Sequence, residues 1–480
     1  MVFSSTVFLF LFLPVVLLVY FALPKVMRNA WLLVASLFFY VWGEKEYSLV
    51  MIGSLVANYL FGLLVDATRG GPHARKALTL TIVANLGLLV AFKYAGLAAD
   101  TYNAVATSLG WKLWHLAPVH LPIGISFFTF HAMSYVIDIY RGDARVQRNP
   151  LDMGVYITLF PQLIAGPILR YHDVADQLRL RVVTWEKFGY GTRRFIIGLA
   201  KKMLLANTLA VAADQIFKLP VEHLAAPVAW LGIVCYTLQL YFDFSGYSDM
   251  AIGLGAMMGF HFLENFNYPY ISRSIQEFWR RWHISLSNWF RDYLYIPLGG
   301  NRVPGWRVGF NLVTVFFLCG LWHGASWCFV AWGLFHGLFL VLERTAWGDF
   351  LKRLPSGLRH LYALLVVMVG WVFFRVENFA NAWHYLVAMA GLNHPVDFAY
   401  SAAFYLDPIT SFALGCAIIA ATPIAPYLRE KLLDGQPLLA SPAGEIGLRF
   451  SRLCLLMGLL TLSAMQLAEG TYNPFIYFRF

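Results

Sequence analysis

Gly320-Leu-Trp-His323-Gly-Ala-Ser-Trp327 lies at the centre of residues 308–342, a run of 35 residues without Asp, Glu, Lys or Arg. A run of this length is long enough to cross a bilayer, so His323 is predicted to lie near the middle of the membrane. An ionisable side chain at that depth is costly, and it usually faces a protein interior or a water-filled cavity that serves a pathway or a reactive site. The alternative is a structural histidine that hydrogen-bonds a neighbouring helix.

The residues around His323 indicate close packing. Gly320 and Gly324 have the small-x-x-x-small spacing that lets two helix backbones approach closely. Trp322 and Trp327 place large rings on either side of the histidine. We therefore expect a tightly packed pocket with little water around one imidazole.

The composition of the whole chain predicts an all-α polytopic membrane protein. Of 480 residues, 59% are hydrophobic and only 13% are charged, which is too few charges to cover a soluble globule of this size. The apolar runs are continuous rather than alternating, which indicates helices rather than a barrel. We expect about 10–12 transmembrane helices with additional re-entrant and interfacial helices. Residues 1–480 are predicted to form one integral membrane domain.

The basic residues indicate orientation in the membrane and not nucleic-acid binding. The net charge of +10 is concentrated in loops, as the positive-inside rule requires of cytoplasmic segments. The first three basic clusters are separated by even numbers of predicted spans, which places the N-terminus on the periplasmic side of a bacterial inner membrane. These clusters are Lys25 with Arg28, then Arg69, Arg75 and Lys76, then Arg141, Arg145 and Arg148. Arg429, Lys431, Arg449 and Arg452 precede the last span, which places the C-terminus on the same side as the N-terminus. The five cysteines are scattered without a C-x-x-C pair, so no metal site is predicted.

A second basic belt follows residues 153–169. Its members are Arg170, Arg179, Arg181, Arg193, Arg194, Lys201 and Lys202. Because basic residues lie on both sides of residues 153–169, this segment is expected to enter and leave the membrane from the cytoplasmic face. Pro161-Gln-Leu-Ile-Ala-Gly-Pro167 would break the helix where protein can shelter the freed backbone groups.

Residues 278–292 carry a helical pattern of large apolar side chains. Positions 279, 282, 283, 286, 289 and 290 fall on one stripe, which predicts a single amphipathic helix at the cytoplasmic face of the membrane. His283 lies on the apolar stripe, whereas Arg280 and Arg281 lie off it. The simplest interpretation is an in-plane anchor whose histidine has no chemical role.

Two carboxylates border apolar runs in Tyr241-Phe-Asp243-Phe-Ser-Gly-Tyr-Ser-Asp249. They are predicted either to fix helix ends or a re-entrant turn by hydrogen bonding, or to relay protons. In the second case Asp243, Asp249, His131 and His323 would form the relay of a proton-coupled transporter or exporter component. Binding or hydrolysis of a thioester would favour an enzyme, and solute flux in liposomes would favour the transporter.

Six motifs occur in one order along the chain. They are Phe160-Pro-Gln-Leu-Ile-Ala-Gly-Pro167, Tyr241-Phe-Asp-Phe-Ser-Gly-Tyr-Ser-Asp249, Asn267-Tyr-Pro269, Phe278-Trp-Arg-Arg-Trp-His-Ile-Ser-Leu-Ser287, Asp292-Tyr-Leu-Tyr-Ile-Pro-Leu-Gly-Gly-Asn301 and Leu321-Trp-His-Gly-Ala-Ser326. Together they resemble the membrane-bound O-acyltransferase (MBOAT) family, and its bacterial alginate O-acetyltransferase branch in particular. The resemblance extends from about residue 122 to the end of the chain and is weak before it.

The resemblance implies a disc of helices with cytoplasmic and external funnels that meet at a thin centre. His323 matches the family's catalytic histidine, and His283 matches the second active-site position. The supporting residues are expected to be Asp243, Asp249, Asn267 and Trp322. A CoA-type donor carries phosphates, so the basic face could contact it through Arg170, Arg193, Arg194, Lys201, Lys202, Arg280 and Arg281, with Trp282 beside them.

The resemblance predicts passage of an acetyl group from a cytoplasmic thioester, acetyl-CoA, to an exported polysaccharide such as alginate. Imidazole is suited to removing the proton of an attacking hydroxyl. Peptidoglycan, cellulose and D-alanyl transfer stay open as alternatives. No bound cofactor is expected. Membrane lipids surround the protein, and the resemblance implies a periplasmic esterase-like partner that relays the acyl group.

The C-terminal residues 475–480, Phe-Ile-Tyr-Phe-Arg-Phe, are unusually aromatic for a solvated terminus. They are expected either to anchor the chain at the membrane interface or to seat Tyr477 as an acyl acceptor. The pattern Phe475-x-Tyr477-x-x-Phe480 resembles the end of the small companion peptide in D-alanyl-transfer systems of the same family. Tyr477 is therefore a candidate acyl acceptor.

Overall fold

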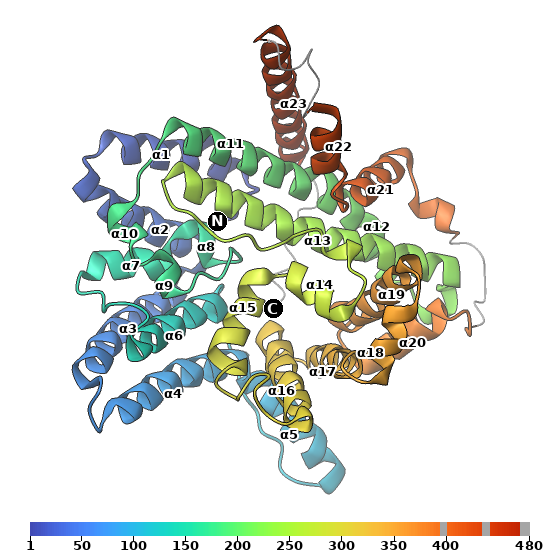
Figure 1. The fold of residues 1–480 in the computed structure, drawn as a ribbon. Coiled ribbons are helices and arrows are strands. Elements are labelled where there is room, and N and C mark those ends of the chain that lie inside the picture. The colour runs from blue at the N-terminus through green and yellow to red at the C-terminus, as the bar shows by residue number, and fades with distance from the viewer. Residues whose placement is uncertain (394–400, 434–441, 471–480) are drawn as a thin grey trace.

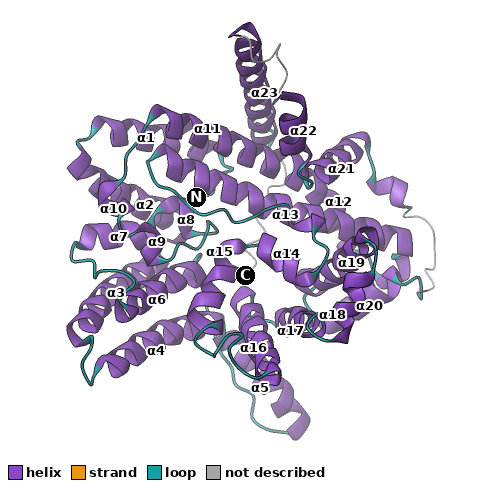
Figure 2. Ribbon diagram, viewed as in Figure 1, coloured by secondary structure: helices purple, strands orange, loops and turns teal. Residues whose placement is uncertain are grey.

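The computed structural model describes residues 1–393, 401–433 and 442–470, and every regular element in these residues is a helix. Helices make up most of the ribbon, and loops join them (Figure 2). The all-α fold class predicted from composition is confirmed, and the chain is a multi-pass membrane protein.

The first half of the chain contains thirteen α-helices. They are α1 (Leu13–Ala22), α2 (Arg28–Glu44), α3 (Ser48–Thr68), α4 (Ala74–Lys93), α5 (Ala95–Leu109), α6 (Ile125–Arg141), α7 (Pro150–Thr158), α8 (Phe160–Leu163), α9 (Tyr171–Val174), α10 (Gln177–Leu180), α11 (Trp185–Ala200), α12 (Thr208–Phe217) and α13 (Ala226–Met257). The described residues that follow contain α14 (Ile275–Arg281), α15 (Ile284–Phe290), α16 (Gly305–His323), α17 (Trp327–Leu342), α18 (Ala346–Arg353), α19 (Ser356–Arg375), α20 (Phe379–Met389), α21 (Pro408–Ala420), α22 (Ile424–Leu433) and α23 (Pro442–Ala468). Three π-helical segments extend neighbouring helices: η1 (Phe8–Phe12), η4 (Lys201–Asn207) and η7 (Arg291–Tyr295).

Seven helical stretches among the described residues are long and apolar enough to cross a membrane, and eight if the bent pair α17 and α18 counts as one span. They are Lys25–Thr68, Ala74–Lys93, Trp185–Phe217, Ala226–Met257, Gly305–His323, Ser356–Arg375 and Ile446–Ala468. The sequence led us to expect about 10–12 spans. The number of stretches is smaller because Lys25–Thr68 holds both α2 and α3, and because several charge-free runs fold as shorter helices, such as Phe8–Ala22 and Pro408–Ala420.

Helices α11 and α13 lie side by side in the upper part of the view, with α13 on the inner side (Figure 1). Glycines allow their backbones to touch: a Cβ atom on Gly191 would lie 2.4 Å from the carbonyl oxygen of Gly253, and one on Gly198 would lie 2.5 Å from that of Gly246. Any larger residue at these positions would push the two helices apart. The apolar helix α23, by contrast, stands out from the body (Figure 1) and is only 6% buried over its spanning window.

The apolar run 308–342 does not form one continuous helix. It forms a hairpin, because α16 ends at His323 and α17 starts at Trp327, with Gly324 in an extended conformation between them. The two arms pack backbone to backbone, since a Cβ on Gly320 would lie 2.3 Å from the carbonyl oxygen of Phe329. The close approach expected at Gly320 is therefore present. His323, which was expected in the middle of a span, is instead the last residue of α16.

The segment with Pro161 and Pro167 is broken as predicted. α7 ends at Thr158, the short helix α8 covers Phe160–Leu163, and the chain then continues to α9 without regular structure. All residues from 159 to 169 are buried, so protein shelters the backbone groups that the break leaves without helical partners.

Candidate active site

His323 is enclosed by aromatic rings. Its side chain is 3% exposed, and its ring centroid lies 4.9 Å from Trp322, 4.9 Å from Trp332 and 5.3 Å from Phe374. Trp327, which was expected to enclose the histidine, is 50% exposed and points elsewhere, because the turn after Gly324 reverses the chain. Trp332 on α17 takes the place expected for Trp327.

His283 lies beside His323, with 6.5 Å between the two ring centroids. The prediction that His283 lies on one continuous amphipathic helix is wrong. The chain breaks between α14 and α15, and His283 itself adopts the left-handed conformation with φ 44° and ψ 55°. This conformation is unfavourable for a residue with a Cβ atom, by about 1–2 kcal/mol, so the surrounding structure must hold it.

Asn265 provides that support. Its side-chain oxygen accepts hydrogen bonds from the backbone N–H of Ser285 at 3.2 Å, from the Ser285 hydroxyl at 2.9 Å and from Nδ1 of His283 at 3.1 Å. Its amide nitrogen donates to the hydroxyl of Ser248 at 3.0 Å. Because a backbone N–H can only donate, the Asn265 atom facing His283 is the oxygen, and Nδ1 of His283 carries a proton. In the neutral ring, Nε2 then holds the free lone pair.

The supporting residue predicted from the motif was Asn267, two positions further along. Its side chain is exposed, and its backbone exchanges hydrogen bonds with Arg281. Asn265 could not be told from Asn267 by sequence, because the residues 258–274 contain no long helix whose periodicity would show which side chain points inward.

A cavity of about 990 Å³ opens next to His323. Phe374, which touches the His323 ring, also lines this cavity, as does Gly324 immediately after it. Charged and polar groups further along the wall include Lys93, Gln239, Arg375 and His384. A small molecule or a side chain of a partner could therefore reach the neighbourhood of the histidine pair.

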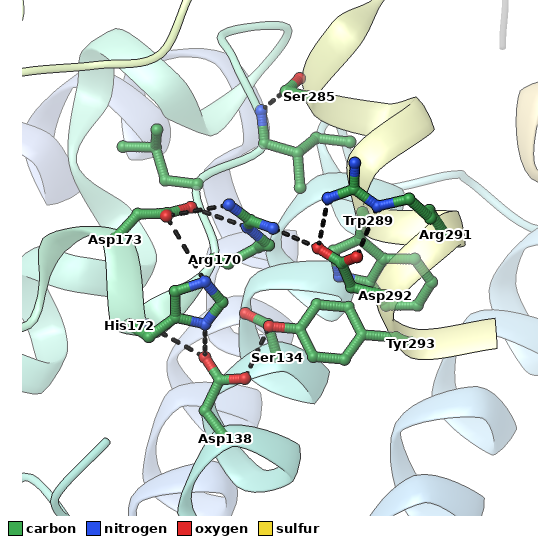
Figure 3. A network of polar contacts seen from close by, with 12 residues as sticks. Ser134, Asp138, Arg170, His172, Asp173, Ser285, Trp289, Arg291, Asp292 and Tyr293 are labelled. Carbon is green, nitrogen blue, oxygen red and sulfur yellow. Dashed lines mark hydrogen bonds and ion pairs between the residues drawn. The ribbon is translucent and has the colours of Figure 1, made fainter. Parts of the chain in front are cut away.

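A network of polar contacts joins the loop before α9 to α6 and η7 (Figure 3). Asp138 accepts hydrogen bonds from the His172 ring at 2.9 Å and from the Tyr293 hydroxyl at 2.7 Å. Arg170 bridges the carboxylates of Asp173 and Asp292. The hydrogen bond to Asp138 raises the pKa of His172, so the contribution of this pair to stability is full at acid pH and is lost as the pH rises through that raised pKa.

This network is connected to the support of His283. The backbone N–H of Ile168 donates to the Ser285 hydroxyl at 3.0 Å, a contact also drawn in Figure 3. The next residue, Leu169, donates its N–H to Nε2 of His131 at 3.3 Å. His131 therefore serves the fold of the broken segment, where it binds a backbone group.

The two acids considered as a proton relay lie on α13, and both are ion-paired with cations of α11 and the π-helical segment η4 that follows it. Asp243 lies 2.6 Å from the Lys202 ammonium. Asp249 contacts Arg194 and Lys201, each at 2.7 Å. Both carboxylates lie within α13, whereas the sequence predicted that they lie at helix ends or in a re-entrant turn. Their charges are balanced by neighbouring cations, which removes the feature that favoured a transporter.

Most cations of the predicted donor-binding face have carboxylate partners. Arg170, Arg194, Lys201 and Lys202 are paired as described above, and Arg281 contacts Glu277 at 3.0 Å. Arg280 is exposed, as is Arg193. Trp282, the aromatic candidate for donor binding, is buried against Phe278 and Trp371. The candidate acceptor Tyr477 and the tail 475–480 lie outside the described residues.

Comparison with known proteins agrees with this arrangement. The family model described as MBOAT, membrane-bound O-acyltransferase family, matches residues 125–385. The chain is 43% identical to a probable alginate O-acetylase of Azotobacter vinelandii and 42% identical to a probable alginate O-acetylase of Pseudomonas aeruginosa, with both partners of each alignment covered in full. It is also 38% identical to a peptidoglycan O-acetyltransferase of Helicobacter pylori, over 82% of this chain and 80% of that protein.

Proposed function

The chain belongs to the membrane-bound O-acyltransferase family, and on that premise we propose that it passes an acetyl group from acetyl-CoA in the cytoplasm to an acceptor outside, for O-acetylation of an exported polysaccharide such as alginate. The observation that carries the proposal is the pair of buried imidazoles, 6.5 Å apart, beside a cavity. Full-length similarity to proteins named as alginate O-acetylases supports this choice of acceptor.

In the proposed reaction His323 removes the proton of the accepting hydroxyl as its oxygen attacks the thioester carbon. The oxygen–carbon bond forms, the carbon–sulfur bond breaks, and the thiolate of CoA leaves with the proton held by His323. His283 provides the second contact to the reacting group, and its Nε2 lone pair is available because Asn265 holds Nδ1–H. The aromatic shell around His323 excludes water, which favours transfer over hydrolysis.

The donor and the acceptor are proposed to arrive from opposite sides of the inner membrane. Exposed cations such as Arg193 and Arg280 lie on the face predicted to be cytoplasmic, where they can meet the phosphates of CoA. The cavity beside Gly324 and Phe374 would receive the acceptor. A periplasmic esterase-like partner would then relay the acetyl group to the polysaccharide, while membrane lipids cover the outer helices.

Replacement of His323 tests the proposed function. In a deletion strain complemented with His323→Ala, ester-linked acetyl on the exported polysaccharide should fall by at least about 100-fold, because the general base is missing. The exposed His73→Ala serves as control and should acetylate like the parent. Full acetylation by His323→Ala at equal protein level would refute the assignment. The donor is tested separately: purified parent protein given acetyl-CoA and an added hydroxyl acceptor, an alginate oligosaccharide, should release CoA as the acetyl group passes to that hydroxyl, and His323→Ala should not.

Tyr477 is proposed as the first acceptor of the acetyl group. A phenol is easier to deprotonate than a sugar hydroxyl, so transfer to tyrosine is a reasonable first step. Tyr477→Phe keeps the ring and removes only the oxygen. It should abolish polysaccharide acetylation if the tyrosine is an intermediate, and mass spectrometry should find acetyl on Tyr477 in a strain that lacks the partner. Parental acetylation by Tyr477→Phe would leave the tail as a membrane anchor.

A further inference from the structure

The end of α16, where His323 lies, depends on groups outside the helix. An α-helix leaves its last four carbonyl groups without partners inside the helix. In α16 the carbonyl of Gly320 accepts a hydrogen bond of 3.3 Å from the N–H of Gly324, and the chain then turns away. The carbonyls of residues 321, 322 and 323 must be satisfied elsewhere, or the turn that carries His323 would fray.

Two consecutive residues at the end of α4 bind all three of these carbonyls. The hydroxyl of Tyr94 donates to the carbonyl of Leu321 at 2.6 Å. The ammonium of Lys93 donates to the carbonyl of Trp322 at 2.5 Å and to that of His323 at 3.3 Å. The last turn of α16 is therefore closed by α4, which lies far away in the sequence.

Lys93 is an unusual residue to find in this place. Its side chain is only 6% exposed, and its third contact is the hydroxyl of Ser126 at 3.1 Å. Within the described residues no carboxylate lies within ion-pair distance of Lys93, so neutral oxygens alone hold its amino group. The main compensation is the C-terminal end of α16, whose dipole is equivalent to roughly half a negative charge. A neutral residue would avoid the desolvation of an ammonium group.

We propose that Lys93 and Tyr94 are positioning residues that hold the imidazole of His323 in place relative to His283. They act through the main chain of α16, since each contacts a carbonyl of the last turn. This inference rests on the proposed role of His323 as the general base. Lys93 and Tyr94 lie outside residues 125–385, which match the family model, so the match assigns them no role.

The local backbone explains why such support is needed. Beyond His323 the chain passes through Gly324 and Ala325 before the N-cap residue Ser326 starts α17. Gly324 must stay small, because a Cβ atom there would lie 2.2 Å from the ring of Phe329. A glycine link cannot fix the direction of the preceding turn by itself, so the capping contacts of α4 set the position of His323.

The test uses four variants of the purified full-length protein, assayed by CoA release from acetyl-CoA with an alginate oligosaccharide added in excess as the hydroxyl acceptor. Lys93→Met removes the charge and its donors but keeps the length of the side chain, Lys93→Arg keeps the charge, and Tyr94→Phe removes one hydrogen bond. The exposed Lys112→Met is the matched control. Lys93→Met should lower kcat by roughly 100-fold with KM for acetyl-CoA within about twofold, because misplacement of a catalytic group by about 1 Å has effects of this size. Lys93→Arg should recover at least about a third of the parental kcat, and Tyr94→Phe should lose about fivefold.

A second readout does not depend on the reaction. Diethyl pyrocarbonate modifies imidazoles, and mass spectrometry of the peptide that contains His323 gives the modification rate. Loosening of the last turn should raise that rate by about tenfold or more in Lys93→Met and leave it unchanged in Lys112→Met. The inference is overturned if Lys93→Met keeps both the parental kcat and the parental modification rate. It is also overturned if Lys93→Met loses kcat, Lys93→Arg does not restore it, and the modification rate of His323 stays unchanged. If Lys93→Met fails to fold, Tyr94→Phe decides by the same two readouts.

An inactive parent protein would be a failure of the proposed function and not of this inference. In that case acetyl-CoA is the wrong donor or the chemistry is different, and the kinetic comparison has no reference. The modification rate of His323 still decides whether Lys93 and Tyr94 hold the last turn of α16. The two failures can therefore be told apart.

Discussion

At the scale of single residues, the orientation of the His283 ring follows from one side chain. Asn265 accepts from Nδ1 of His283, and Ser285 fixes which atom of Asn265 faces the ring. Without this amide the ring could flip or adopt the other tautomer, and Nε2 would no longer be the nitrogen with the free lone pair. The same side chain also holds the left-handed backbone at residue 283 by binding the next turn.

This arrangement predicts a clear difference between two neighbouring asparagines. Asn265→Ala leaves the buried donors of His283 and Ser285 without an acceptor, which should cost about 1–3 kcal/mol in stability and lower kcat by roughly 10-fold to 100-fold. Asn267→Ala removes an exposed amide and should stay within about twofold of the parent in kcat. Thermal unfolding in detergent and CoA release from acetyl-CoA are the measurements.

Asn265→Asp refines that comparison. Aspartate keeps an acceptor for Nδ1–H of His283 but cannot donate to the hydroxyl of Ser248. Its kcat should therefore lie between those of the parent and Asn265→Ala. If Asn265→Ala acetylates at the parental rate, or if Asn267→Ala is the more damaged variant, the support of His283 by Asn265 has no part in catalysis.

Sequence alone singled out His323 for a physical reason, whereas His283 was assigned only through the resemblance of its motif. An imidazole inside a charge-free run is costly to bury, so His323 stood out against its surroundings. Lys93 carried the same kind of signal, a single ammonium at the end of the apolar run 77–92, but it lies before the region that resembles the family. Its contact with the end of α16 joins residues 229 and 230 positions apart, which no local pattern encodes.

At the scale of helices, two breaks decide the site, and they differ in how far sequence could predict them. The turn between α16 and α17 has recognisable signals, since Gly324 ends one helix and Ser326 caps the next by accepting from the N–H of Cys328. The sequence nevertheless favours one continuous span over residues 308–342, because 35 residues without a charge are a stronger indication than two short capping signals. The hairpin is what brings Trp332 to the His323 ring.

The break between α14 and α15 has no such signal. Residues 278–292 contain neither Pro nor Gly, and their apolar stripe favours a straight helix. The left-handed residue His283 is held instead by Asn265, whose backbone carbonyl also accepts from the N–H of Ile284 at 2.9 Å. Tertiary contacts from a distant loop override the local preference here, so the kink that turns His283 towards His323 could be found only from the structure.

At the scale of the whole molecule, the positive-inside rule predicts the side of the membrane on which the cavity beside His323 opens. α4 begins next to Arg75 and Lys76, which are predicted to be cytoplasmic, so its other end at Lys93 lies towards the outside. α19 (Ser356–Arg375) carries arginines at both ends, so its charges alone give it no direction, and its end at Arg375 is placed by the cavity that it shares with Lys93. Both Lys93 and Arg375 line the cavity beside His323, so the cavity is expected to open on the outer side.

This orientation can be tested with single cysteines on either side. Asn381 is exposed and lines the cavity, whereas Glu186 is exposed at the start of α11, next to the second basic belt. In intact spheroplasts a membrane-impermeant maleimide should label Asn381→Cys and leave Glu186→Cys unlabelled. After permeabilisation both should react. The reason is that lipid and the packed centre separate the two faces, and a charged reagent cannot cross either.

The natural cysteines set the background of this experiment. Cys235, Cys319 and Cys328 are buried, whereas Cys416 is half-buried and Cys454 is exposed, so the parent for labelling carries Cys416→Ser and Cys454→Ser. That parent should remain unlabelled under both conditions. Labelling of Glu186→Cys but not of Asn381→Cys in intact spheroplasts would invert the orientation. The cavity beside His323 would then open to the cytoplasm, and the acceptor side of the proposed reaction would have to be exchanged with the donor side.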